Sequence, residues 1–364
     1  MSVYWNSRVR RLSPYVPGEQ PQGERVIKLN TNENPYAPAP EVIEALKRAA
    51  GESLRRYPDP ECWEARSAAA AAYRVRPEQV FMGNGSDEVL AFIFGAFFET
   101  QGPPLLFPDI TYSFYPVYAG LWDIPSRTVP LAGDFSIPVE GFLAPAGGVI
   151  LPNPNAPTGM ALGTAELLRI ADYHAGRKRV VAVDEAYGAF AGGPLPGERS
   201  MAPYIERCPN LLTVHTLSKM GSLAGLRAGF AIGNEALIEG LCRIRDSFNS
   251  YPLDRIAQAG AAAFFQALPY YQGINSRIIA TRRRVSADLE ALGFQVLPSE
   301  ANFLFIRKPG LPGIALLQAL RGRGILARHF NQPRIEDFLR VSIGTDAEMD
   351  DFLWAVSQEA VCQQ

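Results

Sequence analysis

The stretch Arg179-Val-Val-Ala-Val-Asp184-Glu185-Ala-Tyr187 joins a continuous apolar run to two acidic residues. A run without polar alternation is typical of a strand that is buried on both faces of a parallel sheet. Five other short apolar runs end in polar or glycine-rich turns, and helical patterns lie between them. The predicted strands are residues 79–82, 104–107, 148–151, 179–183, 211–215 and 229–232. This alternation predicts an α/β fold whose mostly parallel sheet is covered by helices on both faces.

The pattern changes after about residue 270, where short strands and helices mix without the long apolar runs. The helices predicted before this point are residues 87–98, 164–174, with Thr164 as the expected N-cap, and 235–249. Beyond it we predict helices at 273–292 and 314–322 and strands at 294–297, 302–306 and 339–343. This second part is typical of a smaller α+β domain. The expected division is a proline-rich extended arm over 1–40, a large domain over 41–265 and a small domain over 266–364.

The totals exclude several classes of protein. Of the 364 residues, 47% are hydrophobic and 20% are charged, which argues against intrinsic disorder. The 35 basic and 37 acidic residues nearly balance, so no nucleic-acid or membrane partner is expected. No signal peptide is visible at the start, and the four cysteines, Cys62, Cys208, Cys242 and Cys362, are too far apart for a metal or redox motif. We therefore expect a cytoplasmic protein.

Chemistry-bearing residues gather where the predicted strands end, which is where α/β sheets bind their ligands. Gly83-Asn-Gly85-Ser86-Asp-Glu follows a strand and opens a helix, so its backbone N–H groups can bind an anion or simply form a capped turn. Asp184 can meet a cation or a metal there, or it can serve as a helix N-cap or in a domain-joining ion pair. Thr216-Leu-Ser218-Lys219 ends another strand, and its lysine is either partly desolvated and nucleophilic or simply solvated.

Other site chemistries find little support in the sequence. Asn153-Pro-Asn155-Ala156-Pro-Thr-Gly159 also follows a predicted strand, at 148–151, and is either a fourth part of the strand-end site or a turn and nothing more. The three histidines lack partners at metal-ligand spacing, so no metal is expected. There is no G-x-S-x-G elbow and no Walker-type loop, which argues against hydrolases and nucleotide triphosphatases.

Taken in order, these pieces resemble the fold type I pyridoxal-phosphate enzymes, and most closely the histidinol-phosphate aminotransferase family. The similar blocks run from about residue 12 to 350: Leu29-Asn-Thr-Asn-Glu-Asn-Pro35, Arg56-Tyr57-Pro-Asp59, Gly85-Ser-Asp-Glu88, Thr216-Leu-Ser-Lys219, Ala224-Gly-Leu-Arg227, Ala301-Asn302-Phe303 and Leu339-Arg340-Val-Ser-Ile-Gly-Thr345. The resemblance implies an aspartate aminotransferase-like fold with a seven-stranded sheet, a smaller α+β domain and pyridoxal 5′-phosphate as cofactor. It also implies an obligate homodimer, with the arm at the dimer interface.

The resemblance assigns roles to individual residues. Lys219 would carry the cofactor covalently and shuttle a proton, Asp184 would pair with the ring nitrogen, and Tyr187 would donate to the phenolic oxygen. Tyr112 would stack on the ring, and Tyr57 would reach the phosphate from the neighbouring subunit. The remaining phosphate ligands would be Gly85, Ser86, Thr216, Ser218 and Arg227. The substrate's anionic groups would be bound by Tyr15, Asn32, Asn302, Arg328 and Arg340.

One position departs from the family. Members normally have asparagine where this chain has Ala156, and that asparagine donates to the phenolic oxygen of the cofactor. The neighbouring Asn155 is the candidate to take over the contact. Losing one such hydrogen bond costs about 0.5–1.5 kcal/mol, and we expect the cofactor's chromophore to hold its proton more tightly as a result.

The function implied is amino transfer between histidinol phosphate and 2-oxoglutarate, which yields imidazole acetol phosphate and L-glutamate in histidine biosynthesis. Two alternatives share the same blocks: a lyase similar to phosphothreonine decarboxylase, and an aminotransferase for aromatic or other amino acids. Ala156 and the aromatic residues Phe114, Tyr115 and Tyr251 keep the latter open. A non-catalytic cofactor-binding protein is disfavoured because both Lys219 and Asp184 are present.

Overall fold

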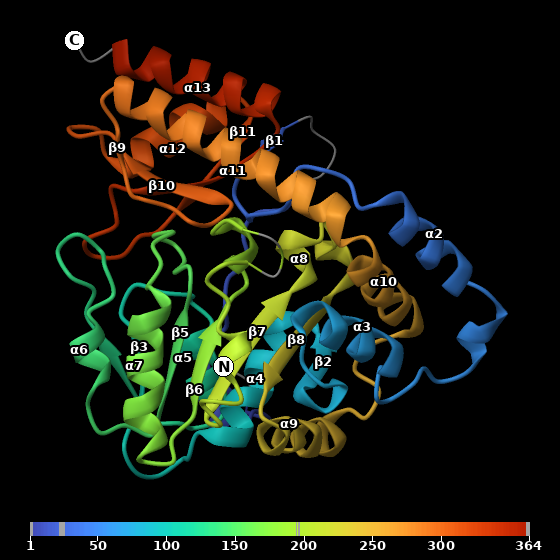
Figure 1. Ribbon diagram of the computed structural model, residues 1–364. Coiled ribbons are helices and arrows are strands. Elements are labelled where there is room, and N and C mark those ends of the chain that lie inside the picture. Colours follow the sequence, from blue (N-terminus) through green and yellow to red (C-terminus); the bar gives the residue numbers. More distant parts are fainter. Residues whose placement is uncertain (1–2, 22–25, 194, 196, 362–364) are drawn as a thin grey trace.

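The computed structural model describes residues 3–21, 26–193, 195 and 197–361 (Figure 1). The strands of its main sheet are β2 (Val80–Asn84), β3 (Leu105–Pro108), β4 (Ser126–Val129), β5 (Gly148–Pro152), β6 (Val181–Asp184), β7 (Leu211–Thr216) and β8 (Ala228–Gly233). Their order across the sheet is β2-β8-β7-β6-β5-β3-β4. β8 runs antiparallel to β2 and β7, whereas the other neighbouring strands pair in parallel. The predicted α/β fold with a mostly parallel seven-stranded sheet is confirmed.

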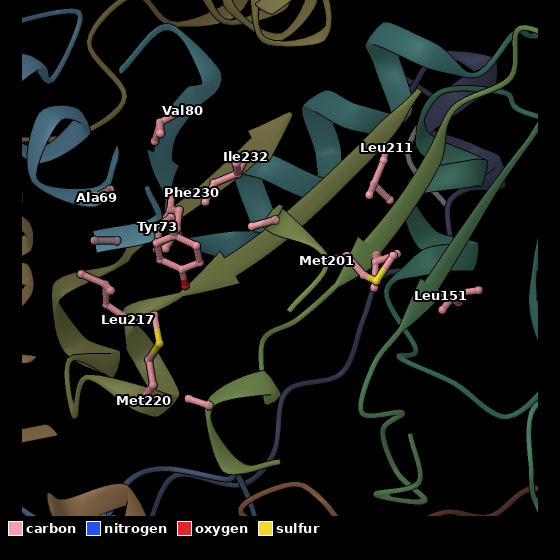
Figure 2. Packing of buried hydrophobic residues seen from close by; sticks show 14 of the residues in the cluster. Ala69, Tyr73, Val80, Leu151, Met201, Leu211, Leu217, Met220, Phe230 and Ile232 are labelled. Atoms are coloured by element: carbon pink, nitrogen blue, oxygen red, sulfur yellow. The ribbon is translucent and has the colours of Figure 1, made fainter. Parts of the chain in front are cut away.

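The sheet is buried on both faces, as its continuous apolar strands require. Along β6, Val181 and Val183 belong to one hydrophobic cluster, whereas Ala182 between them belongs to the cluster on the opposite face. In the first cluster, Tyr73 meets Phe230 edge to face, with ring centroids 5.5 Å apart (Figure 2). Both faces of each central strand therefore contribute to the core.

Helices cover the two faces of this sheet (Figure 1). The helices of this part of the chain, among them α2, which packs on α10, are α2 (Pro40–Ala49), α3 (Trp63–Tyr73), α4 (Gly85–Phe97), α5 (Tyr115–Leu121), α6 (Val139–Phe142), α7 (Thr164–Ala175), α8 (Leu217–Met220), α9 (Glu235–Phe248) and α10 (Arg255–Gln266). Short 3-10 helices occur at Glu52–Arg55, Pro77–Gln79, Gly188–Phe190, Ala202–Tyr204 and Ala224–Leu226.

Two sequence-based details were wrong. Thr164 is the first helical residue of α7, and Gly163 is the N-cap because its backbone is extended and its N–H donates to the Glu166 carboxylate at 2.7 Å. The edge strand β4 was missed because three of its four residues are polar and exposed, so it lacks the apolar run that marks the central strands.

The C-terminal part forms a second layer above one end of the main sheet (Figure 1). Its four-stranded antiparallel sheet has the order β12-β13-β10-β9, with β9 (Gln295–Val296), β10 (Phe303–Arg307), β12 (Arg328–His329) and β13 (Leu339–Ser342). Its helices are α11 (Leu268–Ala291), α12 (Gly313–Gly322) and α13 (Asp346–Val361).

The N-terminal segment joins this second part. It contains α1 (Ser7–Arg11) and β1 (Ile27–Lys28), and β1 pairs in parallel with β11 (Ile325–Leu326). That pairing supports an arm that belongs with the small domain, although the boundaries at residues 40 and 265 stay a prediction.

The described cysteines Cys62, Cys208 and Cys242 are free thiols, and Cys362 lies outside the described residues. Across the described ranges, no helix combines the length and the apolar character that crossing a membrane requires.

Candidate active site

A cavity of about 300 Å³ lies where strands of the main sheet end and the second part of the chain begins. The predicted site residues that line it come from both parts of the fold and from the N-terminal arm. They are Tyr15, Asn32, Ser86, Tyr112, Asp184, Tyr187, Thr216, Ser218, Lys219, Arg227, Arg328 and Arg340. Residues up to 325 positions apart in the chain thus share one cavity (Tyr15 and Arg340).

Lys219 is fixed by the packing of the short helix that carries it. Leu217 and Met220 lie at the two ends of α8, and both belong to the hydrophobic core (Figure 2). The ammonium group donates a hydrogen bond to the carbonyl oxygen of Thr31 at 2.7 Å. Burial lowers the pKa of Lys219 to about 8. A lysine with this pKa is partly deprotonated, and therefore nucleophilic, near neutral pH.

Asp184 ends β6 with its side chain only 4% exposed. One carboxylate oxygen accepts from the backbone N–H of Ala186 at 3.1 Å, and the other accepts from the hydroxyl of Tyr115 at 3.0 Å. Burial raises the pKa of Asp184 to about 6, and these two hydrogen bonds oppose the rise. Tyr115 was missed as a site residue, since nothing in the sequence links it to a carboxylate 69 positions away.

An anion-binding cup forms at the start of α4. Its N-cap residue, Asn84, makes no side-chain capping hydrogen bond, which leaves the first backbone N–H groups open to a ligand. Gly85 has φ +77°, and an added Cβ would lie 2.6 Å from Nη2 of Arg227. An added Cβ at Gly229 would lie 2.4 Å from the backbone nitrogen of Ser86. The two glycines therefore let the guanidinium and β8 approach the start of the helix closely.

Asp87 connects the cup to the aromatic wall of the cavity. Its carboxylate accepts from the Tyr112 hydroxyl at 2.9 Å and from Nη2 of Arg227 at 2.9 Å. Sequence reasoning treated Asp87 only as a possible helix cap, because its two partners lie 25 and 140 residues away. In the structure it holds both predicted cofactor-binding side chains in place.

Tyr187 follows β6 and lies on the cavity wall that packs against the second part of the chain. Its hydroxyl accepts from Nδ2 of Asn32 at 2.9 Å, and its ring packs edge to face on Phe303. Burial raises the pKa of Tyr187, whereas the nearby Arg340 and the Asn32 hydrogen bond act in the opposite direction. Tyr187 therefore keeps its proton at neutral pH. Asn302 is fully buried behind this wall, where it donates to the backbone oxygen of Asn32 at 2.9 Å.

The side of the cavity next to the N-terminal arm carries two further cations. Arg340 donates to the Asn30 carbonyl at 3.0 Å, but its Nε is buried and has no hydrogen-bond partner among the described residues. Arg328 donates to the carbonyl of Val16 at 3.3 Å. The ring of Tyr15 stacks on Phe114 with centroids 4.3 Å apart, so the arm covers this side of the cavity.

Besides the buried Asn302, three predicted site residues do not line the cavity. Gly85 lies under the guanidinium of Arg227. Tyr57 is 78% exposed and stacks on Tyr251 with centroids 4.6 Å apart. Asn155 is fully buried, and its amide donates to the Ile110 carbonyl and the Thr158 hydroxyl.

The hydrogen bonds of Asn155 matter because Ala156, and not Asn155, lines the cavity. Ala156 is buried in a small cluster with Ala301 and Phe303, against which Tyr187 packs. The amide of Asn155 is hydrogen-bonded to Ile110 and Thr158, so the structure does not bring it to the position that an asparagine at residue 156 would occupy.

Comparison with known proteins agrees with this geometry. Residues 24–356 match the family model described as aminotransferase class I and II. This chain belongs to that family. Histidinol-phosphate aminotransferase 1 of Bordetella parapertussis is 54% identical over 98% of this chain and 99% of its own length. Histidinol-phosphate aminotransferase 2 of Thiobacillus denitrificans is 52% identical over 99% and 98%.

The fold of the chain is shared with solved aminotransferase structures. Histidinol-phosphate aminotransferase from Sinorhizobium meliloti, solved with pyridoxal-5′-phosphate, superposes with a TM-score of 0.88 at 24% identity, covering 100% of this chain and 99% of that one. An aspartate aminotransferase from Thermus thermophilus gives 0.81 at 18% identity, covering 98% and 99%. The protein is a pyridoxal-phosphate-dependent aminotransferase that acts on a small-molecule amino donor and a keto acid.

The cavity fits this cofactor group by group. The open start of α4, the hydroxyls of Thr216 and Ser218 and the guanidinium of Arg227 suit a phosphate. The buried carboxylate of Asp184 suits a protonated ring nitrogen, and the amine of Lys219 suits an aldehyde. No group of three or more His, Cys, Asp or Glu side chains that could hold a metal ion occurs among the described residues.

Proposed function

We propose that this aminotransferase moves the amino group of histidinol phosphate to 2-oxoglutarate, forming imidazole acetol phosphate and L-glutamate in histidine biosynthesis. Two curated relatives of more than 50% identity carry the name of this activity, and their alignments cover nearly the whole chain. The proposal also needs a pocket that accepts two different anionic substrates in turn.

The observation that carries the proposal is the pair of arginines on the substrate side of the cavity. Arg340 has an unpartnered buried Nε, and Arg328 lines the same cavity. A buried donor of a charged group that lacks a partner costs more than about 1–3 kcal/mol, which an anionic ligand recovers. The planar guanidinium can donate two parallel hydrogen bonds to either a phosphate or a carboxylate. One pocket can therefore serve both histidinol phosphate and glutamate.

The proposed roles of the other residues follow from their surroundings. When bound, pyridoxal phosphate supplies an electron sink for the bond broken at the substrate Cα. Asp184 keeps a proton on the ring nitrogen by its negative charge, and Tyr187 donates to the phenolic oxygen. Lys219 binds the cofactor through Nζ and, once released, moves a proton at that atom because its lowered pKa suits both uptake and release near pH 8. Tyr112 stacks on the ring, and Asp87 holds it there.

The residues around the cavity suit an aromatic amino acid less well than a phosphate-bearing substrate. Tyr115 is fully buried with its hydroxyl on Asp184, and Tyr251 stacks on Tyr57 outside the cavity. Of the three aromatic residues that kept this alternative open, Phe114 packs on Tyr15 and Tyr115 packs on Tyr112, but none of the three lines the cavity itself. The charged lining favours phosphate and carboxylate substrates.

We further propose that the protein acts as a homodimer in the cytoplasm. Tyr57 is exposed on the single chain, away from the cavity, which supports its role at a neighbouring subunit's site. The free thiols Cys62, Cys208 and Cys242 support a reducing compartment.

The test is a product assay with three donors in parallel. Histidinol phosphate, phosphothreonine and phenylalanine are each offered with 2-oxoglutarate, and glutamate and carbon dioxide are measured. We expect glutamate from histidinol phosphate with the highest kcat/KM. Carbon dioxide from phosphothreonine would establish the lyase instead, and preference for phenylalanine would establish the aromatic aminotransferase.

Two arginine variants, one inside the cavity and one outside it, test whether Arg340 binds the substrate. Arg340→Gln should raise the KM for histidinol phosphate by roughly ten- to a hundredfold, because a hydrogen bond to a charged group contributes about 1.5–3 kcal/mol. Arg307→Gln is the control, since Arg307 lies on β10, donates to Gln295 and does not line the cavity. Equal KM values in the two variants would contradict the assignment of Arg340.

A further inference from the structure

A chain of hydrogen bonds runs from the backbone of Asn32 to the hydroxyl of Tyr187. Asn32 is 1% exposed and has φ 55°, so its backbone N–H turns toward β13 and donates to Oγ of Ser342 at 2.8 Å. The Ser342 hydroxyl lies 3.1 Å from Oδ1 of Asn32. Nδ2 of the same amide lies 2.9 Å from the Tyr187 hydroxyl.

The bonds in this chain have a consistent direction. A backbone N–H can only donate, so Ser342 Oγ accepts from it, and the Ser342 hydroxyl in turn donates to Oδ1 of Asn32. With Oδ1 accepting, the NH₂ group of that amide must face Tyr187 and donate to its hydroxyl oxygen. The hydroxyl hydrogen of Tyr187 is then excluded from this bond and is free to point into the cavity that Tyr187 lines.

We propose that Asn32 is a positioning residue: with Ser342, it orients the Tyr187 hydroxyl so that its hydrogen is donated to the ligand in the cavity. This inference rests on the proposed role of Tyr187 as a donor to the phenolic oxygen of the cofactor. It assigns Asn32 to the cofactor side of the site rather than to direct substrate binding.

The residues around Tyr187 make the hydrogen bond that its hydroxyl donates more important. Ala156, which packs beside Tyr187, has no polar side chain, and the amide of Asn155 donates to the Ile110 carbonyl and the Thr158 hydroxyl instead. Asn302 also stabilises the Asn32 segment, because its side-chain amide donates a hydrogen bond to the backbone oxygen of Asn32. The ionisable groups that contribute most to the pKa of Tyr187 are Arg340, Asp184 and Tyr15, and Tyr187 also interacts with Tyr112 and Tyr115. None of these five residues takes part in the chain of bonds from Ser342.

The sharpest variant reverses the polarity of one bond. Asn32→Asp keeps the shape of the side chain and an oxygen for Ser342, but it places a second oxygen opposite the Tyr187 hydroxyl. That oxygen can only accept when ionised, so it draws the hydroxyl hydrogen away from the cavity. The readout is the pKa of the visible chromophore that Lys219 forms with pyridoxal phosphate, titrated without substrate. A donor to the phenolic oxygen weakens its hold on the proton at Nζ, so losing the donor raises this pKa.

We expect Asn32→Asp to raise the chromophore pKa by about one pH unit or more, and Tyr187→Phe to raise it by a similar amount. In the Tyr187→Phe background, adding Asn32→Asp should have less than half of its effect in the wild-type protein, because the hydroxyl that it redirects is absent. An equal rise in both backgrounds would mean that the new carboxylate acts by its charge alone, which overturns the inference.

Ser342→Ala provides a second route if Asn32→Asp does not fold. Without the serine hydroxyl the Asn32 amide loses its fixed orientation, and the chromophore pKa should rise in the wild-type background but not beside Tyr187→Phe. A rise in Tyr187→Phe with none in Asn32→Asp or Ser342→Ala overturns the inference alone. An unchanged pKa in Tyr187→Phe overturns the role of Tyr187 as well. Failure of the proposed substrate is seen separately, because it appears only in glutamate formation.

Discussion

Replacing Tyr115 by Phe tests how the site keeps Asp184 charged. The tyrosine is fully buried in α5, and its hydroxyl donates to Asp184 at 3.0 Å. The change removes this oxygen and leaves the ring among its aromatic neighbours Phe94, Phe107 and Tyr112. Asp184 then retains one hydrogen bond, from the backbone of Ala186.

The size of the effect follows from the pKa of Asp184, which burial raises to about 6. A hydrogen bond to a charged group contributes about 1.5–3 kcal/mol, equivalent to roughly one to two pH units. Its loss moves the pKa to roughly 7–8. At pH 7 the ionised fraction of Asp184 falls from about nine-tenths to between about a half and a tenth. At pH 9 the carboxylate is ionised in both proteins.

The assay is the affinity of cofactor-free protein for pyridoxal phosphate at these two pH values. The ionised carboxylate pairs with the protonated ring nitrogen. Tyr115→Phe should therefore weaken the binding of pyridoxal phosphate about two- to tenfold at pH 7 and hardly change it at pH 9. Tyr118→Phe is the control, since this tyrosine lies in the same helix and its buried hydroxyl has no hydrogen-bond partner among the described residues. Removing that hydroxyl should leave the affinity unchanged at both pH values.

Two results would refute the reasoning. Equal affinity of Tyr115→Phe and Tyr118→Phe at pH 7 would mean that the hydroxyl does not stabilise the charge of Asp184. A loss of affinity that is as large at pH 9 as at pH 7 would point to disturbed packing rather than to protonation of the carboxylate.

Three further predictions concern the same site. The rate at which cofactor-free protein captures pyridoxal phosphate should rise with pH around a midpoint near 8, since the pKa of Lys219 is about 8 and only the unprotonated amine attacks; a midpoint near 10 would contradict this. Ala156→Asn should lower the pKa of the visible chromophore by about one pH unit by adding a donor beside Tyr187, and an unchanged or higher value would exclude that contact. Sedimentation should give a dimer, and Tyr57→Ala should weaken cofactor affinity about tenfold through loss of a phosphate hydrogen bond; a monomer with unchanged affinity would refute the shared site.

The sheet was predictable because its central strands are buried on both faces and therefore read as continuous apolar runs. β4 escaped because an edge strand needs no such run. Lys219 and Asp184 were predictable from their places at strand ends, where a charged group meets either solvent or a ligand. Their roles, however, came from resemblance to a family rather than from spacing.

The supporting residues could not be found from the sequence. Ser342 and Asn32 are 310 positions apart, and their bond exists only because the N-terminal segment packs against β13. Asp87 binds two side chains that the sequence places on different elements. The orientation of the turn after β5 decides that Ala156 rather than Asn155 lines the cavity, and no pattern of residue types reports that orientation.

The most direct test of the account is a visible absorbance spectrum of the purified protein with pyridoxal phosphate, before and after histidinol phosphate is added. We predict a yellow protein whose visible band disappears on addition of histidinol phosphate as the cofactor takes the amino group, with imidazole acetol phosphate released. Lys219→Ala should lack the band that depends on the lysine. A yellow protein whose spectrum histidinol phosphate leaves unchanged would contradict the proposed substrate, and a protein that cannot be loaded with the cofactor would contradict the assignment of the site.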